Sequence, residues 1–247
     1  MPQNKSQDLE CAILQTLHSS RQPMGSWSLY YLLREQGHGA SAPTIGRKLR
    51  ELEQRKLLGK STVEGRIITP AGERMLRKAM NDEQVRARAD KLLKALDGRT
   101  QKDIIDLLTV RRIIEVESAG LAALHASRVS ITKLEEIVRK QRQAIKKGRL
   151  GVGEDVGFHE ALAQISGNKI LSTTVHLLRS QEWMNYVVTE IRAKVGSRLA
   201  VDHQKIILAL KTRNVSLARR AMEQHLNELI ADVERYGKLV VRRKSPA

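Results

Sequence analysis

The stretch EDVGFHEALA, residues 154–163, decides how the C-terminal half of this 247-residue chain folds. Its apolar residues recur at helical spacing, and Asp155 and His159 stand one helical turn apart beside them. Two later stretches have the same amphipathic pattern and each carries one histidine: VDHQKIILAL (201–210) with His203 and AMEQHLNEL (221–229) with His225. Each stretch therefore predicts a helix that presents a candidate metal ligand beside a buried face.

These four side chains together predict a metal site inside a helical bundle. Asp155 and His159 are i, i+4 neighbours, so both can reach one ion. His203 and His225 fall on two successive antiparallel helices, which can meet the ion from the other side. Each histidine alone is more often a hydrogen-bonded core residue, but histidines gathered with an acidic partner on converging helices favour a shared ion.

The remainder of the C-terminal half is also predicted to be helical, because Leu, Ile, Val and Ala recur at helical spacing and aromatic residues make up only 3% of the chain. Thr100 and Asp103 form a capping-box-like start. The predicted helices run from there to 127 and then cover 130–147, 153–166, 168–190, 197–212 and 215–237. Short breaks between helices favour antiparallel neighbours. The sequence thus predicts a mostly α protein with an antiparallel bundle of six or seven helices.

The N-terminal third has the element order of a winged helix-turn-helix. The predicted elements are helices at 9–19, 26–36 and 41–57, a hairpin around Glu64–Gly65, and a closing helix that starts at Thr69–Pro70. Ser26 is the expected N-cap of the second helix. Trp27, Tyr30 and Tyr31 are interpreted as core residues of this module or as dimer contacts.

The helix SAPTIGRKLRELEQRKL (41–57) has two unlike faces, which is typical of a recognition helix. One face is apolar: Ile45, Leu49 and Leu52. The other is polar and mostly basic: Thr44, Arg47, Lys48, Glu51 and Arg55. We expect base or phosphate contacts from Thr44, Arg47 and Lys48, and phosphate or wing contacts from Arg50, Lys60 and Arg66. The alternative is a solvated face on a winged helix that binds protein.

Charge and composition limit the possible partners and the cellular compartment. A net charge of +17 and a pI near 10.3 indicate a polyanionic partner, although the excess is spread along the chain and does not locate the binding segment. One cysteine, no signal-peptide pattern and no long apolar run predict a reduced cytoplasmic protein without a membrane partner. The predicted parts are a DNA-binding domain (1–80), a helical connector (81–102), the bundle (103–237) and a basic tail (238–247).

Two resemblances to known families follow from these motifs. TIGRKLRELEQRKLL (44–58) followed by GRIITPAGERML (65–76) resembles the winged-helix modules found near ribonuclease R and in archaeal nitrogen repressors. Residues 103–236 resemble the C-terminal FCD domain of the FadR branch of GntR-type transcription factors, on three runs: VRRIIEVESAGLAAL (110–124), DVGFHEALAQISGNKIL (155–171) and DHQKIILALKTRNVSLARRAMEQHL (202–226). The winged helix departs from the GntR signature, so operator sequence and domain geometry are not carried over.

The FCD resemblance implies an all-helical bundle in which one Asp and three His hold a metal ion beside a cavity for a small, usually carboxylate-bearing effector. By motif position, the ligands are Asp155, His159, His203 and His225. Three nitrogens and one oxygen suit Zn, Ni or Mn. An octahedral ion would keep two positions open for water or the effector, whereas a tetrahedral Zn would be structural.

The same resemblance places Arg111 at the cavity, where its guanidinium would bind an effector carboxylate. The alternative for Arg111 is a surface salt bridge to Glu115 or Glu117. Arg179 and Asn168 are further candidates for the effector site, although Asn168 could simply cap the helix that follows Gly167.

These observations predict a homodimeric, metabolite-responsive transcriptional regulator that binds a palindromic operator. A repressor is favoured over an activator. Two alternatives remain open from the sequence. One is a metal-dependent enzyme acting on a small carboxylate, although no separate general base or nucleophile motif accompanies the ligands. The other is a direct metal sensor, in which the ion itself is the signal.

Overall fold

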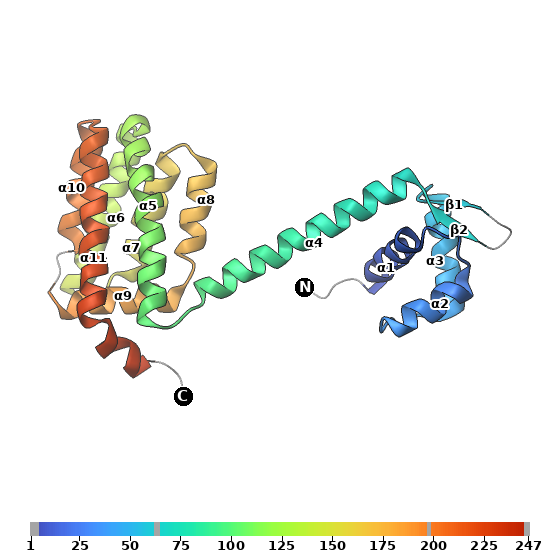
Figure 1. The fold of residues 1–247 in the computed structure, drawn as a ribbon. Helices are drawn as coiled ribbons and strands as arrows, with labels where there is room; N and C mark the ends of the chain where they lie inside the picture. Colours follow the sequence, from blue (N-terminus) through green and yellow to red (C-terminus); the bar gives the residue numbers. More distant parts are fainter. Residues whose placement is uncertain (1–4, 62–64, 197–198, 245–247) are drawn as a thin grey trace. The chain divides into compact units, whose positions relative to one another are not determined.

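The computed structural model describes residues 5–61, 65–196 and 199–244 (Figure 1). The chain divides into two compact units, Met1–Lys91 and Leu92–Ala247. Apart from the connecting loops and turns, the described residues form helices and one small antiparallel sheet. This confirms the predicted mostly α fold.

The N-terminal unit has the winged helix-turn-helix order. Its elements are α1 (Lys5–Ser20), α2 (Ser26–Glu35), α3 (Ala42–Gln54), β1 (Leu58–Lys60), β2 (Arg66–Ile68) and α4 (Pro70–Leu96). β1 and β2 pair antiparallel, with Leu58 opposite Ile68. The predicted turn involves Glu64, which lies outside the described residues, while the amide of Ser61 donates to the carbonyl of Gly65 at 3.1 Å.

Two boundaries in this unit differ from the sequence-based expectation. Ser26 is the first residue of α2, and the N-cap is Gly25, without a side-chain cap. The closing helix and the predicted connector helix are one element, α4, because no Gly or Pro interrupts residues 73–97. Its start is as predicted, since the hydroxyl oxygen of Thr69 accepts a hydrogen bond from the amide of Gly72 at 3.1 Å.

The core of the N-terminal unit is aliphatic. It is built from one face of each helix and the first strand: Leu9, Ile13, Leu14, Leu17, Leu29, Leu33, Ile45, Leu49, Leu52, Leu58 and Leu76. The aromatic residues of α2 lie largely outside this core, because Trp27 is 64% and Tyr31 60% exposed. The expectation that they form the module core is therefore wrong for these two, while Tyr30 packs against its edge.

Within the described residues, seven helices form the bundle of the C-terminal unit (Figure 1). They are α5 (Gln101–His125), α6 (Arg128–Lys146), α7 (Val152–Ile165), α8 (Lys169–Leu178), α9 (Glu182–Lys194), α10 (Leu199–Lys211) and α11 (Val215–Lys244). The expected single helix 168–190 is thus two helices. The helix expected to end at 237 continues to Lys244, so residues 238–244 are helical rather than a separate tail.

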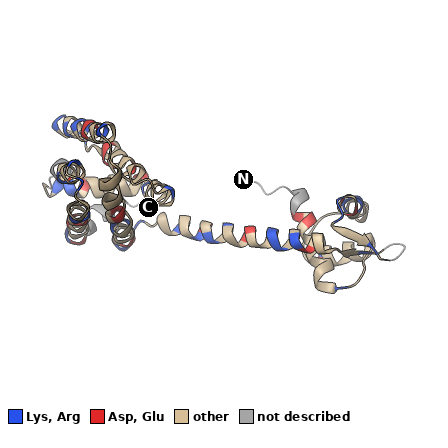
Figure 2. Cartoon of the chain, turned by 90° about the horizontal axis from the view of Figure 1, so that it is seen from above, with Lys and Arg blue, Asp and Glu red and all other residues tan. Residues whose placement is uncertain are grey.

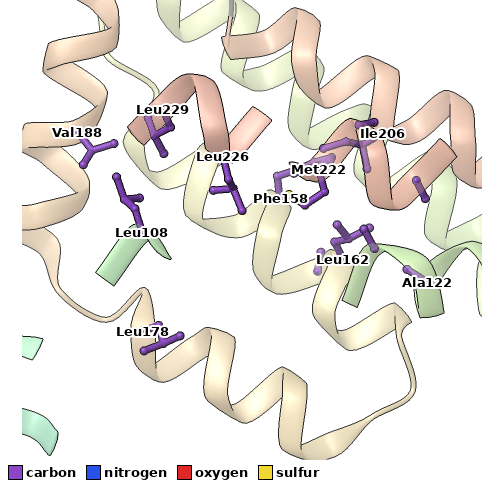
Figure 3. Packing of buried hydrophobic residues seen from close by; sticks show 14 of the residues in the cluster. Leu108, Ala122, Phe158, Leu162, Leu178, Val188, Ile206, Met222, Leu226 and Leu229 are labelled. Atoms are coloured by element: carbon purple, nitrogen blue, oxygen red, sulfur yellow. The ribbon is translucent and has the colours of Figure 1, made fainter. Parts of the chain in front are cut away.

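Local sequence and apolar packing fix the bundle around α5 and α7. At the start of α5, Thr100 and Asp103 form the predicted capping box, in which the carboxylate of Asp103 accepts from the amide of Thr100 at 2.8 Å. Figure 3 shows Phe158 and Leu162 of α7 among apolar side chains of the neighbouring helices. The ring of Phe158 also stacks on the imidazole of His203, with centroids 4.1 Å apart.

Lys and Arg are scattered with fewer Asp and Glu along the helices of both units, which agrees with the spread of positive charge in the sequence (Figure 2). Among the described residues, every helix is too short or too polar to cross a bilayer.

Candidate metal centre and nucleic-acid interface

Three helices bring the four predicted ligands together. Asp155 and His159 come from α7, His203 from α10 and His225 from α11. One ligand atom from each side chain lies within 4.8 Å of the others. The three imidazoles are at most 2% exposed, so the cluster lies inside the bundle.

The imidazoles are oriented by acceptors from other helices. The Nδ1 atom of His203 lies 3.0 Å from Oε1 of Gln141, which makes it the donor. A carboxylate contacts each of the other two Nδ1 atoms: Glu115 for His159, and Asp202, at 3.7 Å, for His225. At His203 this hydrogen bond fixes the tautomer and leaves Nε2 as the metal-binding nitrogen. Nδ1 of His225 also lies 3.5 Å from Nη1 of Arg192.

The Nε2 atoms of His159 and His203 and one carboxylate oxygen face each other in the cluster. Nε2 of His203 lies 3.2 Å from Nε2 of His159 and 3.5 Å from Oδ1 of Asp155. This Oδ1 atom is buried and has no hydrogen-bond donor among the described residues. A buried carboxylate oxygen costs free energy unless a cation or a donor meets it. The arrangement therefore fits a bound cation.

Electrostatics prepare the same groups for metal binding. Burial lowers the pKa of His159 to about 4, with a further contribution from the Arg179 charge, and burial also lowers the pKa values of His203 and His225. Burial alone would raise the pKa of Asp155, but the Arg179 guanidinium and the three imidazoles together outweigh burial and keep the pKa low. At neutral pH the cluster offers three neutral imidazoles and one carboxylate, the forms that bind a metal.

Two buried arginines flank the cluster and share Glu115. The Nε–H of Arg111 donates to Oε1 of Glu115 at 2.7 Å. Arg179 bridges this carboxylate, at 3.4 Å, to Oδ2 of Asp155, at 3.0 Å. The guanidiniums outweigh the effect of burial and hold the pKa of Glu115 well below its usual range. The pair between Arg111 and Glu115 exists, but it is buried rather than at the helix surface.

Arg111 has N–H groups that the hydrogen bond to Glu115 does not use. It is 3% exposed, and its two terminal nitrogens have no acceptor among the described residues. A buried guanidinium ordinarily uses these N–H groups, because leaving them unmet costs free energy. They are therefore available to an external acceptor such as a carboxylate.

Asn168 does not join this cluster. Its side chain is exposed at the N-cap of α8, where Oδ1 accepts from the amides of Ile170 and Leu171 at 3.0 and 3.1 Å. This capping is the alternative that the sequence left open for Asn168, and a contact with an effector stays a prediction. His125 and His176 also lie outside the cluster, where they contact the carbonyl of Ser166 and the carboxylate of Glu160, respectively.

Sequence reasoning missed the acceptors that hold the imidazoles. Asp202 adjoins His203 in a stretch already marked as a site, and that adjacency is the one signal that could have identified it. Gln141 stands in a charged run without any such signal, yet it is fully buried. Glu115 was considered only as a surface partner of Arg111.

In the N-terminal unit, α3 presents the expected two faces. Ala42, Ile45, Leu49 and Leu52 are buried, while Arg47 and Arg50 are exposed. The hydroxyl of Thr44 lies 3.0 Å from that of Ser41 and 3.5 Å from a terminal nitrogen of Arg47. Arg47 and Arg50 are thus accessible to a polyanion.

Of the other predicted DNA contacts, some already form ion pairs within the chain. Lys60 is exposed on β1. Lys48 pairs with Glu51 at 2.7 Å. Arg66 is 17% exposed and donates to Glu53 from Nε at 3.0 Å and from Nη2 at 2.9 Å. Arg66 therefore helps to attach the hairpin to α3, and its assignment as a phosphate contact stays a prediction.

The chain is similar to two families of domains. The FCD domain matches residues 106–228, and the ribonuclease R winged-helix domain matches residues 11–76. These ranges correspond to the bundle and to the winged helix, respectively.

Curated relatives are transcriptional regulators. The chain is 30% identical over 144 residues to the Uxu operon regulator of Haemophilus influenzae, covering 52% of this chain and 53% of that protein. It is 26% identical over 134 residues to the regulator LutR of Bacillus subtilis (52% and 61% covered), and 28% identical over 172 residues to the repressor NanR of Salmonella arizonae (62% and 61%). The chain thus spans between half and two thirds of these relatives' length.

Among solved structures, Escherichia coli McbR/YncC is similar to 95% of this chain and 99% of its own, with a TM-score of 0.50 and 14% sequence identity. At this identity the similarity concerns the fold alone. It agrees with an N-terminal winged helix followed by a helical bundle.

Proposed function

Because this chain belongs to the FadR branch of GntR-type transcriptional regulators, the branch that carries FCD domains, we propose that it is a metabolite-responsive DNA-binding regulator, a repressor by preference. Its C-terminal unit binds a divalent metal ion and a small carboxylate effector that alters operator affinity. The family consists of regulators, so the chain is not an enzyme.

The convergence of one carboxylate and three imidazoles carries the proposal. Their four ligand atoms lie within 4.8 Å of one another in a buried position. Asp155, His159, His203 and His225 would hold Zn, Ni or Mn, and the ion would supply a fixed positive charge beside the effector site.

The effector's carboxylate is assigned to the arginine pair. Arg111 has uncommitted N–H groups, and Arg179 links the metal ligand Asp155 to Glu115. A guanidinium binds a carboxylate through two parallel hydrogen bonds, which gives orientation as well as affinity. An anion at Arg111 would therefore change the contacts of Glu115 and, through Arg179, those of Asp155.

The winged helix supplies the DNA contacts. Arg47 and Arg50 on the exposed face of α3 support major-groove binding, together with Thr44, Lys48 and the wing residue Lys60. Two chains related by a two-fold axis would read a palindromic operator. Effector binding would change the spacing of the two reading heads and so the operator affinity.

The test is a thermal-shift screen of small carboxylates on metal-loaded protein, repeated with Arg111→Ala. We expect at least one carboxylate to raise the Tm of the wild type by mass action and to lose this effect in the variant. Arg112→Ala is the matched control, because Arg112 is the exposed neighbour that pairs with Asn227. Stabilisation that persists in Arg111→Ala would contradict the assigned effector site.

A second measurement separates an effector-responsive regulator from a direct metal sensor. DNA affinity for the chain's own upstream region is measured with metal alone and with metal plus the stabilising carboxylate. The proposal predicts that the carboxylate changes the affinity at constant metal. DNA affinity that follows free metal and ignores the carboxylate would identify the metal itself as the signal.

A further inference from the structure

A groove on the outer side of the bundle combines apolar and basic residues, and it is separate from the proposed effector site. It lies between α6 and α10 and has a volume of about 550 Å³, within the range of small-molecule sites. On α6 it extends from Glu135 to Lys146, roughly 16 Å at 1.5 Å per residue. A molecule with about a dozen carbon atoms would fit this length.

The floor of the groove is apolar and its rim is basic. Val138 and Ile207 form the buried part of the floor, and Leu208 is left 58% exposed beside them. The rim carries four cations: Arg139, Arg142, Lys146 and Lys211. Leu208 adds apolar area to the floor, and covering that area would lower the free energy.

Two of these cations form ion pairs, and the other two have no partner among the described residues. Lys211 pairs with Glu135 at 2.6 Å, and Arg139 pairs with Glu136 at 2.6 Å. Arg142 is half-buried, and neither it nor Lys146 has an ion-pair or hydrogen-bond partner among the described residues. The only acid that lines the groove, Glu135, is thus already neutralised. The free positive charge is concentrated on one side of an apolar floor.

We infer that this groove binds a small amphipathic anion, with an aliphatic or aromatic body on Val138, Ile207 and Leu208 and an anionic head group at Arg142 and Lys146. The site is distinct from the effector site at Arg111, which lies inside the bundle. Charge complementarity selects the head group, and the apolar floor favours such a molecule over a wholly polar phosphate.

The groove shares its two helices with the metal cluster. On α6 the buried Gln141 is followed by Arg142, which lines the groove. On α10 the buried His203 is likewise followed by Gln204, which lines the groove. Gln141 and His203 are bonded to each other across these helices at 3.0 Å. An occupant of the groove therefore contacts the helix pair that orients one of the metal ligands.

The test uses the fluorescent anion 8-anilinonaphthalene-1-sulfonate and its uncharged analogue N-phenyl-1-naphthylamine on the full-length protein. Arg142→Gln with Lys146→Gln should weaken binding of the anion about tenfold or more, as expected for loss of charge-assisted hydrogen bonds. The uncharged analogue should bind the wild type and this variant equally. Leu208→Ser should weaken both probes.

Lys133→Gln with Lys140→Gln is the matched control, because it removes two exposed charges from α6 outside the groove. It should leave the affinity within about twofold, since exposed charges contribute little. Arg111→Ala should also leave it unchanged, which separates this site from the effector site. Anion binding that is equally strong in the folded Arg142→Gln, Lys146→Gln variant, or equally weakened by the control, would overturn the inference.

Discussion

The two units place their candidate functional residues in opposite environments. On α3, Arg47 and Arg50 are exposed and have no ion-pair partner among the described residues. In the bundle the functional groups are buried, and each is held by another polar side chain, as His203 is by Gln141. A surface that binds DNA can tolerate independent side chains, whereas a buried site is stable only if its polar groups satisfy each other. Substitutions should therefore have larger consequences in the bundle.

The largest effect is expected for Glu115→Ala. The substitution leaves two guanidiniums and the Nδ1 atom of His159 without their shared acceptor in the interior. Loss of one partner from a buried ion pair costs about 3 to 5 kcal/mol. We expect the free energy of unfolding, measured by denaturant titration of metal-free protein, to fall by about that amount.

Glu117→Ala on the same helix is the control. Glu117 pairs with Arg219 at 2.9 Å, and both side chains are close to half exposed. Exposed ion pairs contribute roughly 0 to 1 kcal/mol. Equal losses in the two variants would break the contrast between buried and exposed pairs.

Gln141→Leu should weaken metal binding without removing a ligand. The amide oxygen of Gln141 accepts from Nδ1 of His203, and loss of such an outer partner lowers metal affinity about 10- to 100-fold. Metal titration by calorimetry measures the change, and Gln143→Leu, an exposed residue on the same helix, should leave affinity unaltered. An affinity equal to that of the wild type would show that Gln141 does not position His203.

Arg47→Ala should lower operator affinity by about 1 to 3 kcal/mol if it contacts a base, and should relax sequence preference there. The thermal stability should hardly change, because the side chain is exposed and outside the core. Fluorescence anisotropy with the upstream DNA at physiological salt measures the affinity. A stability loss larger than the affinity loss would contradict the description of α3 as a reading surface.

The smallest effect is expected for Arg66→Ala. This arginine pairs with Glu53 at a partly exposed position, so its removal should cost roughly 1 kcal/mol or less of stability. DNA affinity should fall much less than in Arg47→Ala. A loss of DNA affinity as large as that of Arg47→Ala would support Arg66 as a wing contact.

The sequence predicted those parts of the structure that depend on local pattern. The i, i+4 spacing of Asp155 and His159, the capping box at Thr100 and the apolar stripe of α3 are all readable within one helix. The amphipathic stretches around His203 and His225, together with the FCD resemblance, predicted these residues as the remaining candidate ligands. These features need no knowledge of which helices pack together.

The parts that were missed depend on long-range packing or on weak break signals. Glu115 lies on the same face as Arg111, and only the approach of Arg179, 64 residues later, makes their pair part of the site. The break between α8 and α9 contains no Gly or Pro, since residues 179–181 are Arg, Ser and Gln. Local periodicity could therefore not separate the two helices.

Metal titration of the metal-free protein by calorimetry tests the account most directly. With Zn²⁺, Ni²⁺ and Mn²⁺ in turn, we expect at least one of them to bind with a stoichiometry of one ion per chain. His203→Ala should lose that binding, whereas the exposed His176→Ala should retain it. Absence of binding by all three ions, or equal binding by both variants, would contradict a metal centre at these four side chains.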